Sequence, residues 1–286
     1  YSTTFGEKEN ILLETWPKQD TSLIDEKIEE SFDLLKDVVS VAAAARMKGK
    51  LKRRWPLNEA IICLENGQKN TLEPLSELVK SQMNIQNYKI FEIQNSEGIE
   101  LYLELKQNGL PVIPKIELER SGIGPKAKQD MGKLLQMFSE TEPDIIINEL
   151  GDKGTFTFQI DQNSIVLDKE DFIFDFDVEE KYQFAKRQNL IVMISLERDD
   201  EMMAKGLIKD LARRLQTLRK ERGYNPTDIL SKASILELDS ESLDLIKGKT
   251  DEIAFLVRVK EVDFEESCKE YKNDDIDGLK IRISVE

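Results

Sequence analysis

The chain has 286 residues, of which 40% are hydrophobic, and it carries a formal net charge of −15. This length accommodates two or three compact units, and the apolar content is that of a folded protein rather than of a disordered tail. The sequence contains no histidine, which excludes Ser-His and Cys-His nucleophile pairs, a histidine general base and the usual Cys/His zinc site. We therefore expect a protein without a self-contained catalytic centre.

Further features of the sequence bear on the cellular compartment of the protein and on its extent. The longest apolar runs, at 41–45 and 145–147, are far shorter than the roughly 20 residues that cross a bilayer, and no secretory signal is visible. The two cysteines, Cys63 and Cys268, lie far apart, which favours a reducing compartment over a disulfide framework. We expect a cytoplasmic protein with no membrane partner. Its first residue is Tyr1 rather than Met, which suggests a piece of a longer protein.

The first half of the chain predicts a long helix followed by short helices and strands. The long helix is expected over 22–54, because acidic residues crowd its first turns and cations crowd its end. Ser22 with Asp25 resembles a capping pair, and Trp55-Pro56 stops the helix. Beyond it, we expect a strand at 60–65, a helix at 72–83 and strands at 88–93, 99–105 and 111–118. The stretch 121–138 predicts a turn that leads into a helix, with Pro125 near its first position.

The second half begins with short β segments and ends with another helix-led unit. The β segments occupy 155–197, and a second long helix is expected at 201–222, ended by Gly223. It is followed by an expected strand at 233–238, a helix at 240–257 and strands at 259–264 and 279–285. The stretches 22–105 and 200–286 thus share the order helix, strand, helix, strand, strand. This order predicts a degenerate repeat of architecture.

These elements predict an α+β fold of long helices and small mixed α/β modules. We expect four segments along the chain. They are the end of a helical domain at 1–55, an α/β module at 56–142, a β-rich module at 143–199 and a C-terminal α/β module at 200–286.

Positive charge is concentrated at the ends of the two long helices. Residues 46–54 include six cations and no acid, and residues 205–222 include seven cations and two acids. These 27 residues carry +11, so the other 259 carry −26. Complementing a helix dipole accounts for two or three cations at a helix end, but not for six. We therefore predict a phosphate-binding surface on a body whose acidity repels nucleic acid elsewhere.

The candidate nucleic-acid contacts come from both helix ends and from one turn. At 122–128, glycines and two lysines begin a helix, where backbone amides can bind phosphate, although a tight strand-to-helix turn explains the glycines equally well. Trp55 has two open interpretations: a platform for an unpaired base, or a core residue that closes the helix end. The candidates are Lys48, Lys50, Lys52, Arg53, Arg54, Trp55, Lys126, Lys128, Arg213, Arg214, Arg219 and Lys220.

Four stretches of the sequence resemble one family. They are "WPKQDTSLIDEKIEE" at 16–30, "LKRRWPLNEAII" at 51–62, "GPK" at 124–126 and "GLIKDLARRLQTLRKERGYNPTDIL" at 206–230. Together they resemble, in order and over nearly the whole chain, the C-terminal region of isoleucyl-tRNA synthetase of the archaeal and eukaryotic-like type. The last stretch is the most specific. It resembles E-G-L-x-R-E-x-x-R-R-x-Q-x-x-R-K-E-x-G, with Lys205 at the first glutamate and Lys209-Asp210 at the Arg-Glu pair.

The resemblance implies a function in binding tRNA. Residues 1–55 would complete a helical anticodon-binding domain, and the remaining modules would help to grip the anticodon arm of the isoleucine tRNA. Of the family's adenylation signatures, H-x-G-H requires histidine and K-M-S-K-S is not found. The implied partners are therefore the isoleucine tRNA and the catalytic and editing domains of the same polypeptide. ATP and Mg²⁺ are implied for that parent ligase, with no cofactor, metal or catalytic residue in this region.

A protein-docking module of a synthetase is the alternative that stays open. In that interpretation the basic helix ends meet an acidic protein surface instead of RNA. An unrelated enzyme is disfavoured by the lack of histidine and of any convergent site motif.

Overall fold

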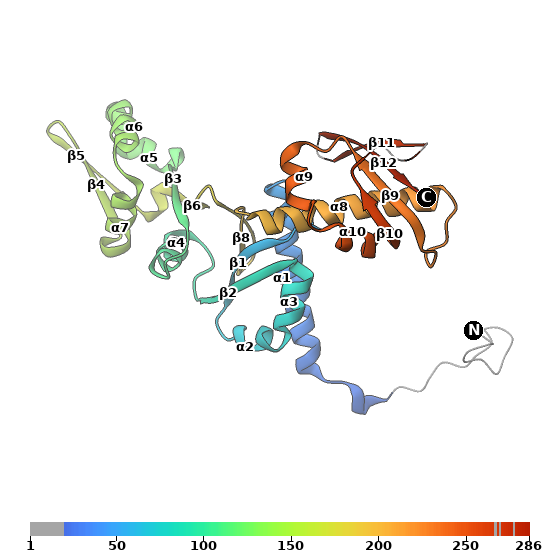
Figure 1. Ribbon diagram of the computed structural model, residues 1–286. Helices are drawn as coiled ribbons and strands as arrows, with labels where there is room; N and C mark the ends of the chain where they lie inside the picture. The colour runs from blue at the N-terminus through green and yellow to red at the C-terminus, as the bar shows by residue number, and fades with distance from the viewer. Residues whose placement is uncertain (1–19, 266–267, 269, 277) are drawn as a thin grey trace.

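A computed structural model of the chain describes residues 20–265, 268, 270–276 and 278–286 (Figure 1). It confirms the predicted α+β class, with long helices and small mixed sheets. The first predicted motif begins at Trp16, so its first residues, like the first 19 of the 1–55 segment, lie outside the described residues. Within the described part of the chain, none of the helices is both long and apolar enough to cross a membrane.

The first long helix, α1 (Glu26–Lys48), is shorter than predicted at both ends. Asp25 is its N-cap, and the carboxylate of Asp25 accepts hydrogen bonds from the backbone of Lys27 and Ile28 at 3.0 and 3.2 Å. The prediction that it continues to residue 54 is wrong. Gly49 caps the helix, and Lys50 adopts a positive φ of 54°, which turns the chain away. The basic residues 50–54 therefore form a turn.

A central four-stranded sheet lies beside α1. Its order is β2-β1-β8-β7, with β1 and β2 parallel and the other neighbours antiparallel. One face packs on α1 and on the short helices that join β1 to β2, in a core that includes Val38, Ile62 and Val192. The elements are β1 (Leu57–Glu65), α2 (Lys69–Leu72), α3 (Ser76–Met83), β2 (Ile85–Ile93), β7 (Tyr182–Arg187) and β8 (Leu190–Ser195).

The segment between β2 and β7 folds as an insertion and includes one wrong prediction. The strand expected at 99–105 is helix α4 (Gly98–Gln107). A short apolar run does not distinguish strand from buried helix, and here tertiary packing decides. Ile99, Tyr102 and Leu105 face one core, and Glu104 accepts hydrogen bonds from two backbone amides just before the helix.

The rest of the insertion combines two small sheets with three helices. The turn expected before Pro125 is instead part of helix α5, which ends where Lys128 adopts a φ of 44°. A second helix, α6, follows it, and helix α7 was not predicted. β3 pairs with β6 and β4 pairs with β5, both antiparallel. The elements are β3 (Val112–Leu118), α5 (Arg120–Ala127), α6 (Met131–Glu140), α7 (Pro143–Lys153), β4 (Thr155–Ile160), β5 (Asn163–Asp168) and β6 (Phe172–Val178).

The C-terminal unit begins with the second long helix, α8, and builds a second four-stranded sheet. Its order is β10-β9-β12-β11, and α8 and α10 pack on it in one core with Leu211, Ile235 and Ile283. Strand β11 was not predicted. The elements are α8 (Asp200–Glu221), β9 (Leu230–Leu236), α9 (Ser240–Ile246), α10 (Thr250–Val257), β10 (Val259–Asp263), β11 (Lys272–Ile276) and β12 (Leu279–Val285).

The predicted repeat of architecture is present, with different boundaries. In both sheets the strand after the long helix pairs in parallel with the next strand and antiparallel with the second strand of a hairpin. The registers agree: Ala60 pairs with Ile194 in the first copy, and Ala233 with Val285 in the second. The first copy is completed by β7 and β8, not by 99–105. It is interrupted by the insertion, which leaves the sheet after β2 and returns at β7.

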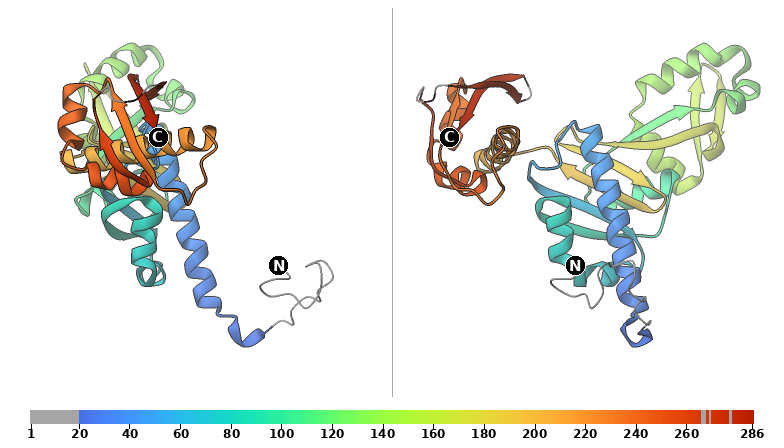
Figure 2. Two further views of the ribbon diagram at one scale, coloured as in Figure 1. Left: turned by 45° about the vertical axis from the view of Figure 1, so that its right-hand side comes forward. Right: turned by 90° about the vertical axis from the view of Figure 1, so that its right-hand side faces the viewer.

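The hydrophobic cores divide the chain differently from the four predicted segments. α1 shares a core with β1, and Leu134 shares another with Ile146, so packing gives no boundary at 55 or at 142. The second face of the central sheet, including Ile61 and Met193, belongs to the core of the insertion. The C-terminal unit has its own core and stands apart from the rest, joined near the start of α8 (Figure 2).

Candidate nucleic-acid interface

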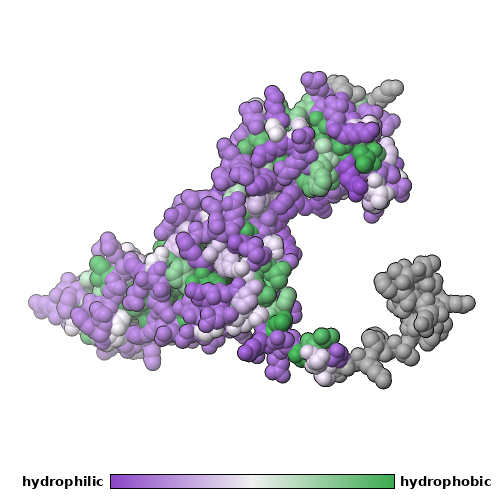
Figure 3. Space-filling model, turned by 60° about the horizontal axis from the view of Figure 1, so that its bottom comes forward, coloured by the Kyte–Doolittle hydropathy of each residue, from purple (hydrophilic) through white to green (hydrophobic). Residues whose placement is uncertain are grey.

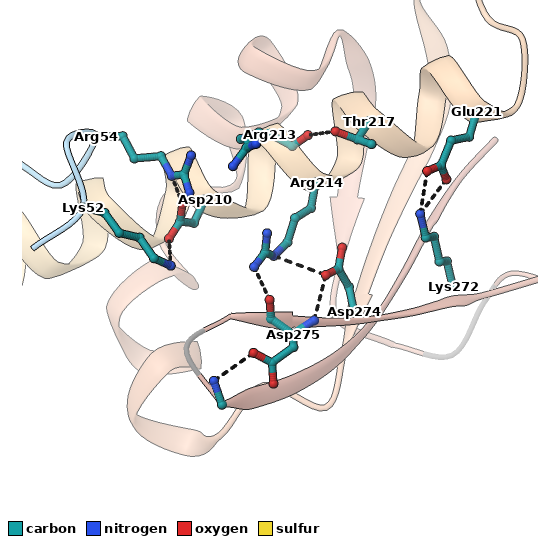
Figure 4. A network of polar contacts seen from close by, with 11 residues as sticks. Lys52, Arg54, Asp210, Arg213, Arg214, Thr217, Glu221, Lys272, Asp274 and Asp275 are labelled. Atoms are coloured by element: carbon teal, nitrogen blue, oxygen red, sulfur yellow. Dashed lines mark hydrogen bonds and ion pairs between the residues drawn. The ribbon is translucent and has the colours of Figure 1, made fainter. Parts of the chain in front are cut away.

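A buried carboxylate joins the basic turn after α1 to helix α8. The side chain of Asp210 on α8 is fully buried, yet three side chains of the turn donate to it, of which Lys52 and Arg54 are drawn in Figure 4. Lys52 Nζ lies 3.1 Å and Trp55 Nε1 3.0 Å from Asp210 Oδ2, and Arg54 Nε donates to Oδ1. Burial raises the pKa of Asp210, but these three hydrogen bonds outweigh it and hold the pKa below its ordinary value.

Trp55 fills the gap between the turn and α8. A methyl group at Gly206 would lie 2.5 Å from two atoms of the indole, so the ring packs directly on the helix backbone there. The guanidinium of Arg198 covers the same ring at 4.9 Å from its centroid. Of the two interpretations of Trp55, this packing supports the residue that closes the helix end.

Each repeat copy contains one buried arginine that holds the turn after its long helix against the end of a short helix. Arg46 donates to the carbonyls of Lys52, Trp55, Met83 and Asn84 at 2.8 to 3.1 Å. Arg219 donates in the same way to the carbonyls of Asn225, Asp228, Val257 and Arg258. In each copy the guanidinium donates to the carbonyls of the residues six and nine positions after the arginine. It also donates to two carbonyls at the end of the short helix that precedes the edge strand.

This role accounts for one of the predicted contact residues. Arg219 is only 5% exposed, and its guanidinium is occupied by four carbonyls, so it has no surface to offer to a phosphate. The prediction of Arg219 as a tRNA contact is therefore corrected: it is a structural residue. Arg46 behaves alike. Burial, with a contribution from Arg53, lowers its pKa to about 10, so it stays cationic at neutral pH.

A hollow at the junction gathers cations from three elements. We call it the junction hollow. The turn after α1 forms one wall, the C-terminal end of α3 another, and α8 the third. Arg53 and Lys209 are exposed there, while Lys52 and Arg54 are held in place by Asp210. The residues that line it are Lys52, Arg53, Arg54, Ser81, Gln82, Asn84 and Lys209.

Five other predicted residues lie near the junction or along α8. Lys48 is exposed, and its ammonium lies 5.1 Å from the centroid of the Phe184 ring. Lys50, Arg213 and Lys220 are exposed as well. Arg214 instead turns toward the β11 strand, with Nε 3.6 Å from Asp274 and a hydrogen bond to the carbonyl of Asp275 (Figure 4). Its charge is therefore engaged within the C-terminal unit.

The two lysines predicted near the glycine-rich turn are not brought to the junction. Lys126 belongs to the insertion, where it binds Asp168 at 2.8 Å and also the buried Asp171. These hydrogen bonds raise its pKa. Lys128 is exposed in the turn between α5 and α6. The structure thus separates this pair from the junction hollow and ties Lys126 to its own unit.

The junction hollow also contains residues that were not among the candidates. Lys209 lies in the basic cluster at 205–222, and its membership of that cluster could have identified it as a candidate from the sequence. Ser81, Gln82 and Asn84 carry no such signal, because only the end of α3 folding against the turn brings them there. Asn84 Nδ2 donates to the carbonyl of Arg53 at 3.1 Å, which fixes one wall to another.

Comparison with known proteins places these features in a family context. Residues 1–62 match the family described as the anticodon-binding domain of tRNA ligase. The chain is 26% identical over 282 residues to the isoleucine–tRNA ligase of Archaeoglobus fulgidus, covering 97% of this chain and 24% of that relative. It is 28% identical over 223 residues to that of Saccharolobus solfataricus, covering 78% of this chain and 21% of the relative.

The similarity extends to a bacterial relative. The isoleucine–tRNA ligase of Porphyromonas gingivalis is 23% identical over 290 residues, covering 100% of this chain and 24% of the relative. The chain spans about a quarter of the length of these relatives. The predicted resemblance to isoleucyl-tRNA synthetase is confirmed.

Proposed function

We propose that this chain is the tRNA-binding C-terminal region of a cytoplasmic isoleucyl-tRNA synthetase, and that its junction hollow contacts the anticodon arm of the isoleucine tRNA. The similarity to isoleucine–tRNA ligases over nearly the whole chain supports the family assignment. The single observation that carries the binding surface is the gathering of cations from the turn after α1 and from α8 in one hollow of an acidic protein.

The proposed mechanism is positional. Arg53 and Lys209, exposed on two walls of the hollow, neutralise phosphates of the bound arm. Lys52 and Arg54 add positive charge while their bonds to Asp210 fix the turn. The chemistry, with ATP and Mg²⁺, belongs to catalytic and editing domains elsewhere in the parent ligase. This region contributes binding affinity and fixes the position and orientation of the tRNA on the ligase.

Charge reversal at the exposed cations tests the proposal. The variant Arg53→Glu/Lys209→Glu leaves the Asp210 network intact. We expect it to weaken binding of an isoleucine tRNA transcript in a filter-binding titration at low salt, and to reduce the slope of log affinity against log salt by about 2. The matched control, Lys27→Glu/Lys115→Glu, makes the same charge change at exposed residues far from the hollow.

Four outcomes are informative. A loss confined to the hollow variant supports the proposal. Equal losses in both variants would indicate unspecific attraction, and no loss in either would contradict the surface. Binding of an acidic protein in place of tRNA, lost on the same charge reversal, would favour the docking module.

A further inference from the structure

The C-terminal unit has a second hollow at the place that corresponds, in the repeat, to the junction hollow. We call it the terminal hollow. Asn84 in the first copy and Arg258 in the second both end the short helix before the edge strand with φ of 51° and 59°. Each hollow is built around that residue and the end of that helix. The residues that line the terminal hollow are Ile229, Ala254, Phe255, Leu256, Arg258 and Val259.

The two hollows differ in chemistry. The α3 residues that line the junction hollow are polar, whereas the terminal hollow presents a phenyl ring and aliphatic side chains. Phe255 is 82% exposed and Ile229 64% exposed. In the face drawn in Figure 3, the C-terminal unit shows apolar residues among mainly hydrophilic ones. An aromatic ring this exposed, beside an exposed isoleucine in the same hollow, points to a binding role.

A row of exposed polar side chains along α8 connects the two hollows. Lys209, Arg213, Gln216 and Lys220 are exposed, and their spacing of four, three and four residues places them on one face of the helix. Lys209 lines the junction hollow, and Gln216 Nε2 donates to the carbonyl of Leu256 in the terminal hollow at 2.8 Å. Seven residues of helix separate these two points by about 10 Å, roughly the reach of two nucleotides.

We propose that Phe255 is a stacking platform for an unpaired base of RNA whose phosphates follow this row. This inference rests on the proposed function. Arg258 is exposed in the same hollow as the ring, and the exposed cations Arg213 and Lys220 of the row on α8 supply positive charge for the phosphates. A base stacks on a phenyl ring without needing hydrogen-bond readout, so the platform suits an unstacked loop or end of RNA.

The surrounding charge favours RNA over a second copy of the chain. A two-fold dimer through this face would bring the cationic row on α8 against the same row of the second copy, and two chains of −15 each repel one another. Three acids lie close in sequence to the terminal hollow: Asp251 and Glu252, one turn before the ring on the same face of α10, and Asp228 beside Ile229. Glu252 acts on the charge of Lys205 near the start of α8, and Asp228 accepts a hydrogen bond from the backbone of Asn225. The cationic row and the aromatic ring together match the composition of single-strand binding surfaces.

Substitution of the ring tests the platform in the 286-residue chain. Phe255→Ala removes it at a site too exposed to affect folding, and Phe255→Trp keeps an aromatic face. We expect Phe255→Ala to weaken binding of a single-stranded RNA carrying 2-aminopurine by about 5- to 100-fold with an unchanged salt slope. It should also abolish the quenching of 2-aminopurine by stacking, while Phe255→Trp retains both.

The outcomes separate this inference from the proposed function. If Phe255→Ala binds and quenches like the parent chain while Arg53→Glu/Lys209→Glu still weakens tRNA binding, the platform is overturned and the proposed function stands. If neither substitution matters, both fail. If sedimentation shows a dimer that Phe255→Ala dissociates and RNA does not, the ring is a self-association contact and the inference is overturned.

Discussion

Trp55 donates a hydrogen bond of 3.0 Å to the buried carboxylate of Asp210, a residue 155 positions later in the chain. This contact joins the turn that follows α1 to the helix that begins the C-terminal unit. Because Lys52 and Arg54 donate to the same carboxylate, it also sets which cations are engaged and which stand exposed. The shape and the charge of the junction hollow thus depend on one acidic side chain.

Asp210→Asn should weaken the junction. The asparagine side chain has the shape of aspartate, but its amide cannot accept hydrogen bonds from all three donors, two of which are charged. We therefore expect the free energy of unfolding to fall by about 3 kcal/mol. Urea denaturation followed by tryptophan fluorescence measures it. Asp274→Asn is the control, because its partner Arg214 lies at 3.6 Å in a partly exposed pair, and its effect should stay below about 1 kcal/mol. Equal effects of the two substitutions would contradict this role of Asp210.

The contribution of Asp210 should also depend on pH. Its pKa in the folded protein lies below the ordinary value, so the unfolded chain takes up the proton first as the pH falls. The stabilisation is therefore complete above the unfolded pKa of about 4 and is lost as the pH falls through the folded pKa. Unfolding free energies of the parent chain and of Asp210→Asn, measured between about pH 6 and pH 2.5, should converge in acid. A constant difference over that range would show that ionisation of Asp210 does not matter.

Gly206→Ala should disturb the packing of Trp55. The new methyl group would lie 2.5 Å from the indole, and the ring cannot move away without losing its hydrogen bond to Asp210. We expect a loss of about 1 to 3 kcal/mol and a change in tryptophan emission. Gly132→Ala is the matched control, because it lies in helix α6 with open space around it and should be neutral or slightly stabilising. A Gly206→Ala protein as stable as this control would contradict the close packing.

Arg219→Met and Arg46→Met should each destabilise one copy of the repeat. Either substitution leaves four carbonyls without their guanidinium donor, and we expect a loss of at least about 3 kcal/mol. Hydrogen exchange followed by mass spectrometry should localise the effect, to residues 200–286 for Arg219→Met and to the central sheet for Arg46→Met. Arg213→Met, at an exposed position of α8, should change stability by less than about 0.5 kcal/mol. Uniform exchange across both units would argue against separate clamps.

Local sequence signals were enough for the elements that carry strong periodicity or clear ends. The two long helices and the β-rich stretch follow from spacing, caps and charge at helix ends, which act within a few residues. The repeat needed the tertiary structure, because its first copy is completed by β7 and β8 and not by the strand expected at 99–105. The family resemblance was also visible in the sequence, because most of its longest motif, 206–230, lies in one helix, α8. Within that motif, the structure shows what three residues do. Gly206 allows Trp55 to pack closely, Asp210 accepts hydrogen bonds from the turn, and Arg219 donates to backbone carbonyls.

Tertiary structure alone decided which positive charges face solvent. In sequence, Arg53, Arg54, Arg213 and Arg219 are equivalent members of basic clusters, yet one of them is buried against four carbonyls and another is bound to Asp210. Whether a cation is exposed or engaged depends on partners that lie more than a hundred residues away, or on a helix end that packs against it. The sequence by itself therefore determined that positive charge is gathered at two helix ends. Only the packing of the repeat copies decided that part of it holds the fold and that the exposed remainder forms a surface.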